Sequence, residues 1–219
     1  MMFTRLSTLA IACMVSTTTF AFQSAQALNQ LELGLEYGKA EQEYSRDGYS
    51  GDNTGDENGY RIFGTYYFNS NMGIRIGYAN FGEAETYSED FWAYDPEINN
   101  DVRFRVEDIS DAKALTFGAV VSTPITQGPF ELWGEVGLAR WDVEVNSSLS
   151  APDYDVQVDA VKDSDSDISI YGGFGVRFQA NEQFGLGISA LWYTMEPDLF
   201  DETWDLQVQV ISFNGSFRF

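Results

Sequence analysis

Apolar and polar residues alternate position by position over eight separate segments of this 219-residue chain. In the final segment, Ile211, Phe213, Phe217 and Phe219 share one face, and Arg218 lies on the opposite, polar face. A period of two marks a β-strand that separates two unlike environments. An aromatic last residue suits a strand whose apolar side faces lipid, because water-exposed termini usually fray. The pattern therefore predicts an all-β chain whose strands contact lipid.

The eight predicted strands are 30–39, 59–68, 72–81, 113–122, 130–140, 168–179, 183–193 and 206–219. Apolar residues of the last strand occupy even positions up to Val210 and odd positions from Ile211 onward. Either a β-bulge at this point or a strand start placed too early would account for the change of phase.

The connections between these strands alternate in length. Those at 69–71, 123–128 and 180–182 are short, whereas those at 40–58, 82–112, 141–167 and 194–205 are long. Short turns on one rim and long loops on the other are typical of outer-membrane barrels, and an even strand count places both termini on the short-turn side. We expect an eight-stranded antiparallel up-and-down transmembrane β-barrel with short periplasmic turns and four long acidic extracellular loops.

Alternation alone also fits a soluble barrel of the lipocalin type, in which the apolar side faces inward. The polar face, however, is rich in Gly, Ala, Ser and Thr and carries few charges. Small residues suit the crowded interior of a narrow barrel. This composition favours lipid on the outside.

The N-terminal segment predicts export. Arg5 precedes an apolar run over 6–15, and residues 25–27 read Ala-Gln-Ala, so we expect a signal peptide, 1–27, cleaved before a barrel domain, 28–219. The alternatives are a retained anchor, for which the run is short of the roughly 20 residues of a spanning helix, and a lipoprotein acylated at Cys13. Cys13 is the only cysteine, so the expected mature chain has no disulfide.

Charge is distributed unevenly along the chain. The net charge is −22, which argues against a nucleic-acid partner. Most of the 34 acids lie in the long connections, but eight charged residues fall on the inward face of the strands. They are Glu32, Glu36, Arg61, Arg75, Glu131, Glu135, Arg177 and Arg218. Because buried charge needs a partner, we predict a Glu–Arg network that plugs the lumen, with a gate or ion path as the alternative.

With these features the chain resembles the small eight-stranded outer-membrane barrels, namely the OmpA-like transmembrane domain and its Ail, Lom and opacity-protein relatives. The resemblance covers essentially all of 28–219. It implies that the C-terminal aromatic residues Phe213, Phe217 and Phe219 form the signal that the barrel-assembly machinery recognises. Some such chains are labelled porins, but an aqueous channel needs about 16 strands.

Residue types restrict the activity further. The chain has no histidine, which removes His-based catalysis, and the carboxylates of Glu131 and Glu135 point into a filled lumen. We expect no enzyme activity, no cofactor and no metal in a defined site. The acidic runs 52–59 and 163–167 carry oxygen ligands that suit Ca²⁺ without the complete spacing of a calcium loop, so a solvated charge run is the simpler interpretation.

The remaining expectations concern the loops. Arg103 and Arg105 lie in an alternating stretch, 102–107, that predicts a hairpin extending the third and fourth strands. Phe91, Trp92 and Tyr94 either pack within this loop or form an adhesive tip. We expect a structural or surface-interaction role in the bacterial outer membrane through acidic loops, with a narrow channel or porin-like carrier as the alternative. Expected partners are outer-membrane lipid and lipopolysaccharide, the assembly machinery, and divalent cations at the acidic loops.

Overall fold

The computed structural model describes residues 30–45, 53–95, 100–124, 128–154, 156–200 and 202–219. The strands are β1 (Gln30–Ser45), β2 (Asn53–Tyr67), β3 (Met72–Asp95), β4 (Asn100–Pro124), β5 (Phe130–Ala151), β6 (Val156–Gln179), β7 (Phe184–Met195), β8 (Asp198–Leu199), β9 (Glu202–Thr203) and β10 (Asp205–Arg218), with one 3-10 turn, η1 (Pro152–Tyr154). The predicted signal peptide, Cys13 and Asp52, the first residue of the acidic run 52–59, lie outside the described residues. Within the described residues, no helix is long and apolar enough to cross a membrane.

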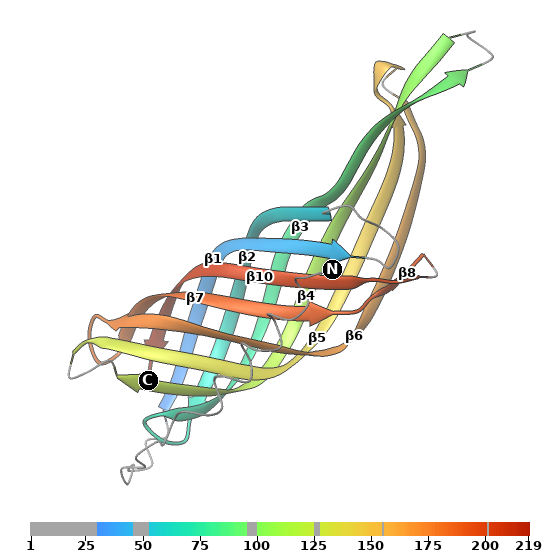
Figure 1. The fold of residues 1–219 in the computed structure, drawn as a ribbon. Coiled ribbons are helices and arrows are strands. Elements are labelled where there is room, and N and C mark those ends of the chain that lie inside the picture. The colour runs from blue at the N-terminus through green and yellow to red at the C-terminus, as the bar shows by residue number, and fades with distance from the viewer. Residues whose placement is uncertain (1–29, 46–52, 96–99, 125–127, 155, 201) are drawn as a thin grey trace, which may run out of the picture.

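Eight of these strands close into one antiparallel barrel in the order β1-β10-β7-β6-β5-β4-β3-β2 (Figure 1). Closure joins the first strand to the last, because Leu33 of β1 pairs with Phe217 of β10. All eight predicted strands are present, and the fold class predicted from the alternation is confirmed. The short β8 and β9 pair only with each other.

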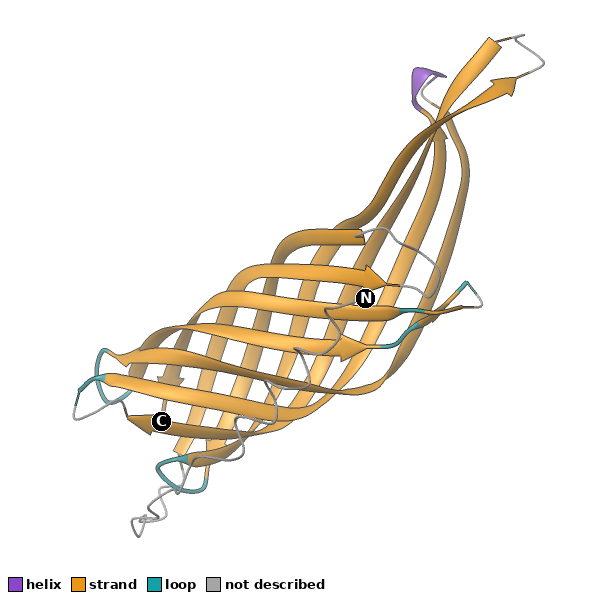
Figure 2. Cartoon of the chain, in the orientation of Figure 1, coloured by secondary structure: helices purple, strands orange, loops and turns teal. Residues whose placement is uncertain are grey.

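The strands are longer than the alternation predicts, and the extra length lies at the end opposite the short turns. Pairing of β2 with β3 stops at Asn80, whereas β3 and β4 stay paired out to Asp95 and Asn100. Likewise β7 leaves β6 at Tyr171, whereas β5 and β6 stay paired out to Ala151. The predicted hairpin over 102–107 is confirmed as part of this extension. We call residues 83–95, 100–112, 142–151 and 156–167 the arm; it projects beyond the rest of the barrel (Figure 2).

The outer surface near the short turns is apolar. Outward side chains within 31–37, 60–68, 74–78, 115–121, 130–138, 168–178, 184–192 and 211–217 form what we call the outer belt. Aromatic residues lie at both margins, with the rings of Tyr60 and Tyr78 6.5 Å apart at the upper margin and those of Phe130 and Phe178 5.4 Å apart at the lower. An apolar band between two aromatic girdles is the outer surface of a lipid-spanning barrel.

Above the outer belt the two faces of the sheet exchange character. On β1 the outward residues change from apolar, ending at Tyr37, to charged, beginning at Lys39, while the inward residues Ala40 and Tyr44 become part of a hydrophobic cluster. We call this inward cluster the upper core. Its members are Ala40, Tyr44, Ala79, Phe81, Ala112, Ala114, Ala139, Trp141, Val143, Val145, Tyr171, Leu191, Tyr193, Met195, Leu199, Leu206, Val208 and Val210. The same cluster continues down to Trp133, which lies beside Arg75 in the lumen below.

The same exchange explains the phase change in the last strand. Val208 and Val210 point inward and Ile211 and Phe213 point outward, in one uninterrupted register against both β1 and β7. The predicted bulge is wrong, and so is the alternative of a late strand start, because β10 is continuous from Asp205. The surroundings of the outer face change along the strand, from the apolar outer belt to the charged surface above it. The apolar residues therefore move from the outward to the inward face, while the backbone register stays the same.

Candidate functional site

The lower lumen, inside the outer belt, holds the eight charged residues singled out from the sequence. Seven of them are nearly or fully buried and Arg218 is partly exposed. They reach the lumen because each occupies an inward position of its strand, between outward residues of the belt. The inward face is crowded: a Cβ built on Gly34 would lie 2.2 Å from the ring of Phe63, so a larger residue there would displace that ring.

Glu32 is the acceptor at the centre of the lower lumen. Its carboxylate receives two hydrogen bonds from the Arg177 guanidinium, at 2.7 and 2.9 Å. Arg218 donates to the same carboxylate from Nη2 at 2.9 Å, and Arg75 Nη2 lies 3.5 Å from Glu32 Oε1. Three arginines from three different strands therefore converge on one acid.

Glu135 is a second acceptor, on the opposite wall. Arg61 and Arg75 both donate to it, the latter at 2.8 Å, and Arg61 also lies 3.5 Å from Glu36. Since Arg75 contacts both Glu32 and Glu135, the two groups form one network.

Glu131 completes this network near the short turns. Its Oε2 lies 3.7 Å from both Arg177 and Arg218 and accepts a hydrogen bond from Gln179 at 2.7 Å. The structure thus joins all eight predicted residues, four acids and four arginines whose formal charges cancel.

Several neutral residues of the lumen contact the arginines, and these contacts were not predicted from the sequence. The Arg75 guanidinium lies between Phe63 and Trp133, 4.0 and 4.9 Å from the two ring centroids, and donates from Nε to Thr65 at 2.7 Å. The Arg218 guanidinium lies 4.9 Å from the ring of Tyr67. These rings share the inward parity of the charged residues, so the alternation places them on this face but does not show that they lie against the guanidinium groups.

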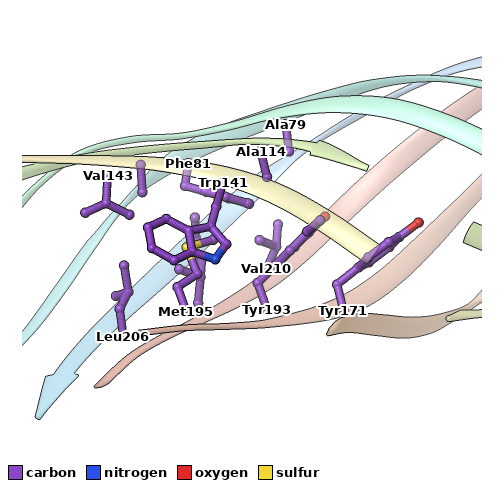
Figure 3. Close-up of a cluster of buried hydrophobic side chains, with 14 of the residues drawn as sticks. Ala79, Phe81, Ala114, Trp141, Val143, Tyr171, Tyr193, Met195, Leu206 and Val210 are labelled. Carbon is purple, nitrogen blue, oxygen red and sulfur yellow. The ribbon is translucent and has the colours of Figure 1, made fainter. Parts of the chain in front are cut away.

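The upper core lies directly above the network. Figure 3 shows Trp141, Met195, Leu206 and Val210 gathered inside the barrel, with Tyr193 and Tyr171 beside them. The stacked rings of Tyr171 and Tyr193, 5.4 Å apart, lie beneath Phe81, whose ring is 4.8 Å from that of Tyr193. A cavity of about 10 Å³ remains between this layer and Glu36 and Arg61, room for about one water.

The acidic run 163–167 is used within the fold. Asp163 accepts a hydrogen bond from the backbone N–H of Phe200 at 2.6 Å, and Asp165 accepts one from that of Asp198 at 2.8 Å. These carboxylates attach the β8–β9 segment to the side of β6. No group of ligand side chains arranged for a metal ion occurs among the described residues.

The arm carries its own ion pairs. Arg105 donates to Asp90 at 2.8 Å, and Arg103 donates to Asp153 of η1 at 2.9 Å. The hydrogen bond from Arg105 lowers the pKa of Asp90. Phe91 stacks on Phe104 with centroids 5.6 Å apart, as the packing interpretation predicts.

The other two aromatic residues of this loop are exposed. Trp92 is 65% exposed and Tyr94 59%. The terminal aromatic residues are also on the outside: Phe213 and Phe219 are exposed, and the Phe217 and Phe219 rings lie 4.9 Å apart.

A closed eight-stranded barrel with an apolar belt and a charged lumen is the architecture of outer-membrane proteins. The sequence matches the family described as outer membrane protein beta-barrel domain over residues 7–219. The chain belongs to this family. It is therefore a bacterial outer-membrane protein, and the outer belt is its lipid-facing surface.

Solved structures share this fold at low sequence identity. Neisserial surface protein A is 13% identical, with a TM-score of 0.51, and the match covers 90% of this chain and all of that protein, 100%. Ail, the attachment invasion locus protein of Yersinia pestis, is 17% identical with a TM-score of 0.46, covering 86% of this chain and 98% of Ail. No curated protein sequence matches the chain significantly.

Proposed function

We propose that this outer-membrane protein is a non-enzymatic surface protein that binds an extracellular partner through its arm. The observation that carries the proposal is the projection of two paired hairpins beyond the barrel, with Trp92 and Tyr94 exposed on one of them. Large aromatic side chains on a rigid support are frequent anchors of binding surfaces.

Rigidity supports this role. The Arg105–Asp90 pair ties the two strands of the β3–β4 hairpin together, and the Arg103–Asp153 pair ties that hairpin to η1. A preformed surface loses less conformational entropy on binding than a flexible loop. The arm is thus better suited to recognition than to a gating movement.

The barrel itself serves as a closed anchor in this proposal. The carboxylates of Glu32 and Glu135 already accept hydrogen bonds from arginines, which leaves them poorly placed for acid–base work on a substrate. The upper core adds an apolar layer above the charged network, a further obstacle to ions.

Arm variants test the proposal. In cells that display the protein, we expect Trp92→Ser combined with Tyr94→Ser to lower adherence to the recognised host or matrix surface about tenfold, the loss expected for one or two anchor residues. The matched control is Ser148→Ala combined with Ser150→Ala on β5, which should retain adherence. Unchanged adherence of the aromatic variant, with normal heat-modifiable migration, would refute the proposal.

A narrow channel is the alternative function, and the charged lower lumen is the observation that favours it. Planar-bilayer conductance separates the two. A closed anchor gives no reproducible pores, whereas pores that disappear on Arg75→Ala or Glu131→Ala would establish a path through the network.

The remaining partners are part of the same proposal. We assign residues 1–27 to export, the Phe213, Phe217 and Phe219 face to recognition by the assembly machinery, and the acidic surface above the belt to divalent cations that bridge lipopolysaccharide phosphates. The strongly acidic chain is assigned no nucleic-acid partner.

A further inference from the structure

A second small cavity lies at the top of the barrel, where the upper core meets the foot of the arm. Its walls are four aromatic rings together with Thr86, Asp108, Val145 and Leu199; the rings are those of Tyr44, Tyr87, Phe200 and Trp204. The cavity volume is about 10 Å³. The Tyr44 and Trp204 rings meet edge to face, 6.2 Å apart.

Asp108 gives this aromatic cavity a charge. Its Oδ1 is buried and has no hydrogen-bond partner. Within the described parts of the chain, no Lys or Arg forms an ion pair with Asp108. A buried carboxylate oxygen without a partner is unfavourable, and its position in the wall of a cavity indicates a ligand that donates a hydrogen bond.

The walls and the size of the cavity select the ligand. Aromatic faces attract cations, and a carboxylate provides the countercharge. The volume admits a group of about the size of one water. A primary ammonium group meets both conditions, because it is compact, positively charged and carries three donors. A guanidinium or a quaternary ammonium group is larger than this space.

We propose that the cavity binds a primary ammonium group, as found on a lysine side chain or a polyamine, with its N–H directed at Asp108 Oδ1 and its charge against the Tyr44 and Trp204 rings. A net charge of −22 raises the concentration of such cations near the surface. Such a site would add to the proposed surface role. It rests on that role only if the ammonium group is a lysine of the extracellular partner.

The β8–β9 segment borders the cavity. Leu199 and Phe200 line its wall, and Asp163 and Asp165 attach the segment to β6. Phe200 has a φ of 53°, in the left-handed region that is unfavourable for a bulky residue.

The test uses the full-length barrel in lipid nanodiscs and n-butylammonium, a mimic of the lysine side chain, measured by titration calorimetry. We expect saturable binding that Asp108→Asn weakens about tenfold or more, the effect of losing a charge-assisted hydrogen bond. The matched control is Asp90→Asn, whose carboxylate faces Arg105 on the arm; it should bind like the parent. Neutral n-butanol and n-butyltrimethylammonium should bind far more weakly.

Equal binding by the parent and Asp108→Asn, equal binding of n-butanol, or no binding up to about 100 mM, where even very weak sites fill, would each overturn the inference. Trp92→Ser with Tyr94→Ser should leave n-butylammonium binding unchanged, so failure of the arm proposal is distinguishable from failure of this site. Comparison of spermidine with a pentapeptide that contains one lysine then identifies the source of the ammonium group.

Discussion

Arg75 illustrates how single residues hold the lower lumen together. It is fully buried, yet its guanidinium contacts Glu135 and Glu32, donates to Thr65, and lies against Phe63. Removing the partners of such a buried charge strongly destabilises a protein. This holds even where the intact network adds little stability compared with an apolar core. The network therefore specifies one arrangement of the strands, and its acids are the sensitive positions.

Glu32→Ala tests this sensitivity. The substitution removes the shared acceptor of Arg177 and Arg218 and leaves both cations buried or partly buried without their closest acid. We expect the free energy of unfolding to fall by about 3–5 kcal/mol, measured by urea unfolding of the barrel in lipid vesicles. Glu43→Ala, on the exposed outer face of the same strand, should change it by less than about 0.5 kcal/mol. Equal losses for the two variants would show that the network does not stabilise the barrel.

Phe219→Ala tests the terminal aromatic residue. Phe219 is exposed, so its loss should change the stability of the finished barrel little, but its backbone N–H donates to Leu31 at the point where the barrel closes. We expect a lower level of assembled barrel in cells and unchanged folding of the purified chain into detergent. Quantitative heat-modifiability gels measure both. Normal assembly in cells would show that Phe219 is merely the end of a strand.

At the residue scale, alternation was enough to predict the inward charges, because parity alone decides which side of a strand a residue occupies. It could not predict which acid meets which arginine. Those contacts, such as Arg177 with Glu32, join strands that are distant in sequence and depend on the shear of the closed barrel. The alternation also places Phe63 and Trp133 on the inward face, but it does not reveal that their rings lie against the Arg75 guanidinium.

At the scale of the strand, β10 shows why one medium cannot be assumed along a whole element. Its first half has Gln207 and Gln209 outside and valines inside, and its second half has Ile211 and Phe213 outside. In the arm, alternation is further obscured by register shifts, such as that between Glu85 and Tyr87. The lipid-facing strand segments were therefore predictable, whereas their extensions, apart from the stretch 102–107, read as loops.

Cysteine substitutions along β10 test the uninterrupted register. The only native cysteine, Cys13, lies in the predicted signal peptide, so labelling of the barrel reports only on the single cysteine introduced there. In intact cells we expect a water-soluble maleimide to label Gln207→Cys and Gln209→Cys but not Ile211→Cys, which faces lipid. Val208→Cys is the inward control and should stay unlabelled. Labelling of Val208→Cys but not of Gln207→Cys would contradict the uninterrupted register and support a bulge in β10.

At the scale of the whole molecule, the barrel is two environments in series. The lipid-facing half is apolar outside and charged inside, and the half above it is charged outside and apolar inside. On β1, β4 and β5 the first outward charges above the belt are Lys39, Lys113 and Arg140, and acids such as Glu41 and Asp142 follow them. Phosphates of lipopolysaccharide at this level meet cations nearest the membrane and acids beyond, where divalent ions are needed to offset repulsion.

Removal of divalent cations tests that arrangement. In lipopolysaccharide bilayers, we expect EDTA to lower the thermal unfolding midpoint by a few degrees, since about 1 kcal/mol corresponds to about 2–4 °C for a chain of this size. Glu41→Gln combined with Asp142→Asn should reduce the EDTA effect, because fewer exposed acids then face the phosphates. Phosphatidylcholine bilayers are the control, in which EDTA should change neither protein. If the double variant responds to EDTA as strongly as the parent, the cations act on the lipid alone and the acidic residues above the belt do not bind them.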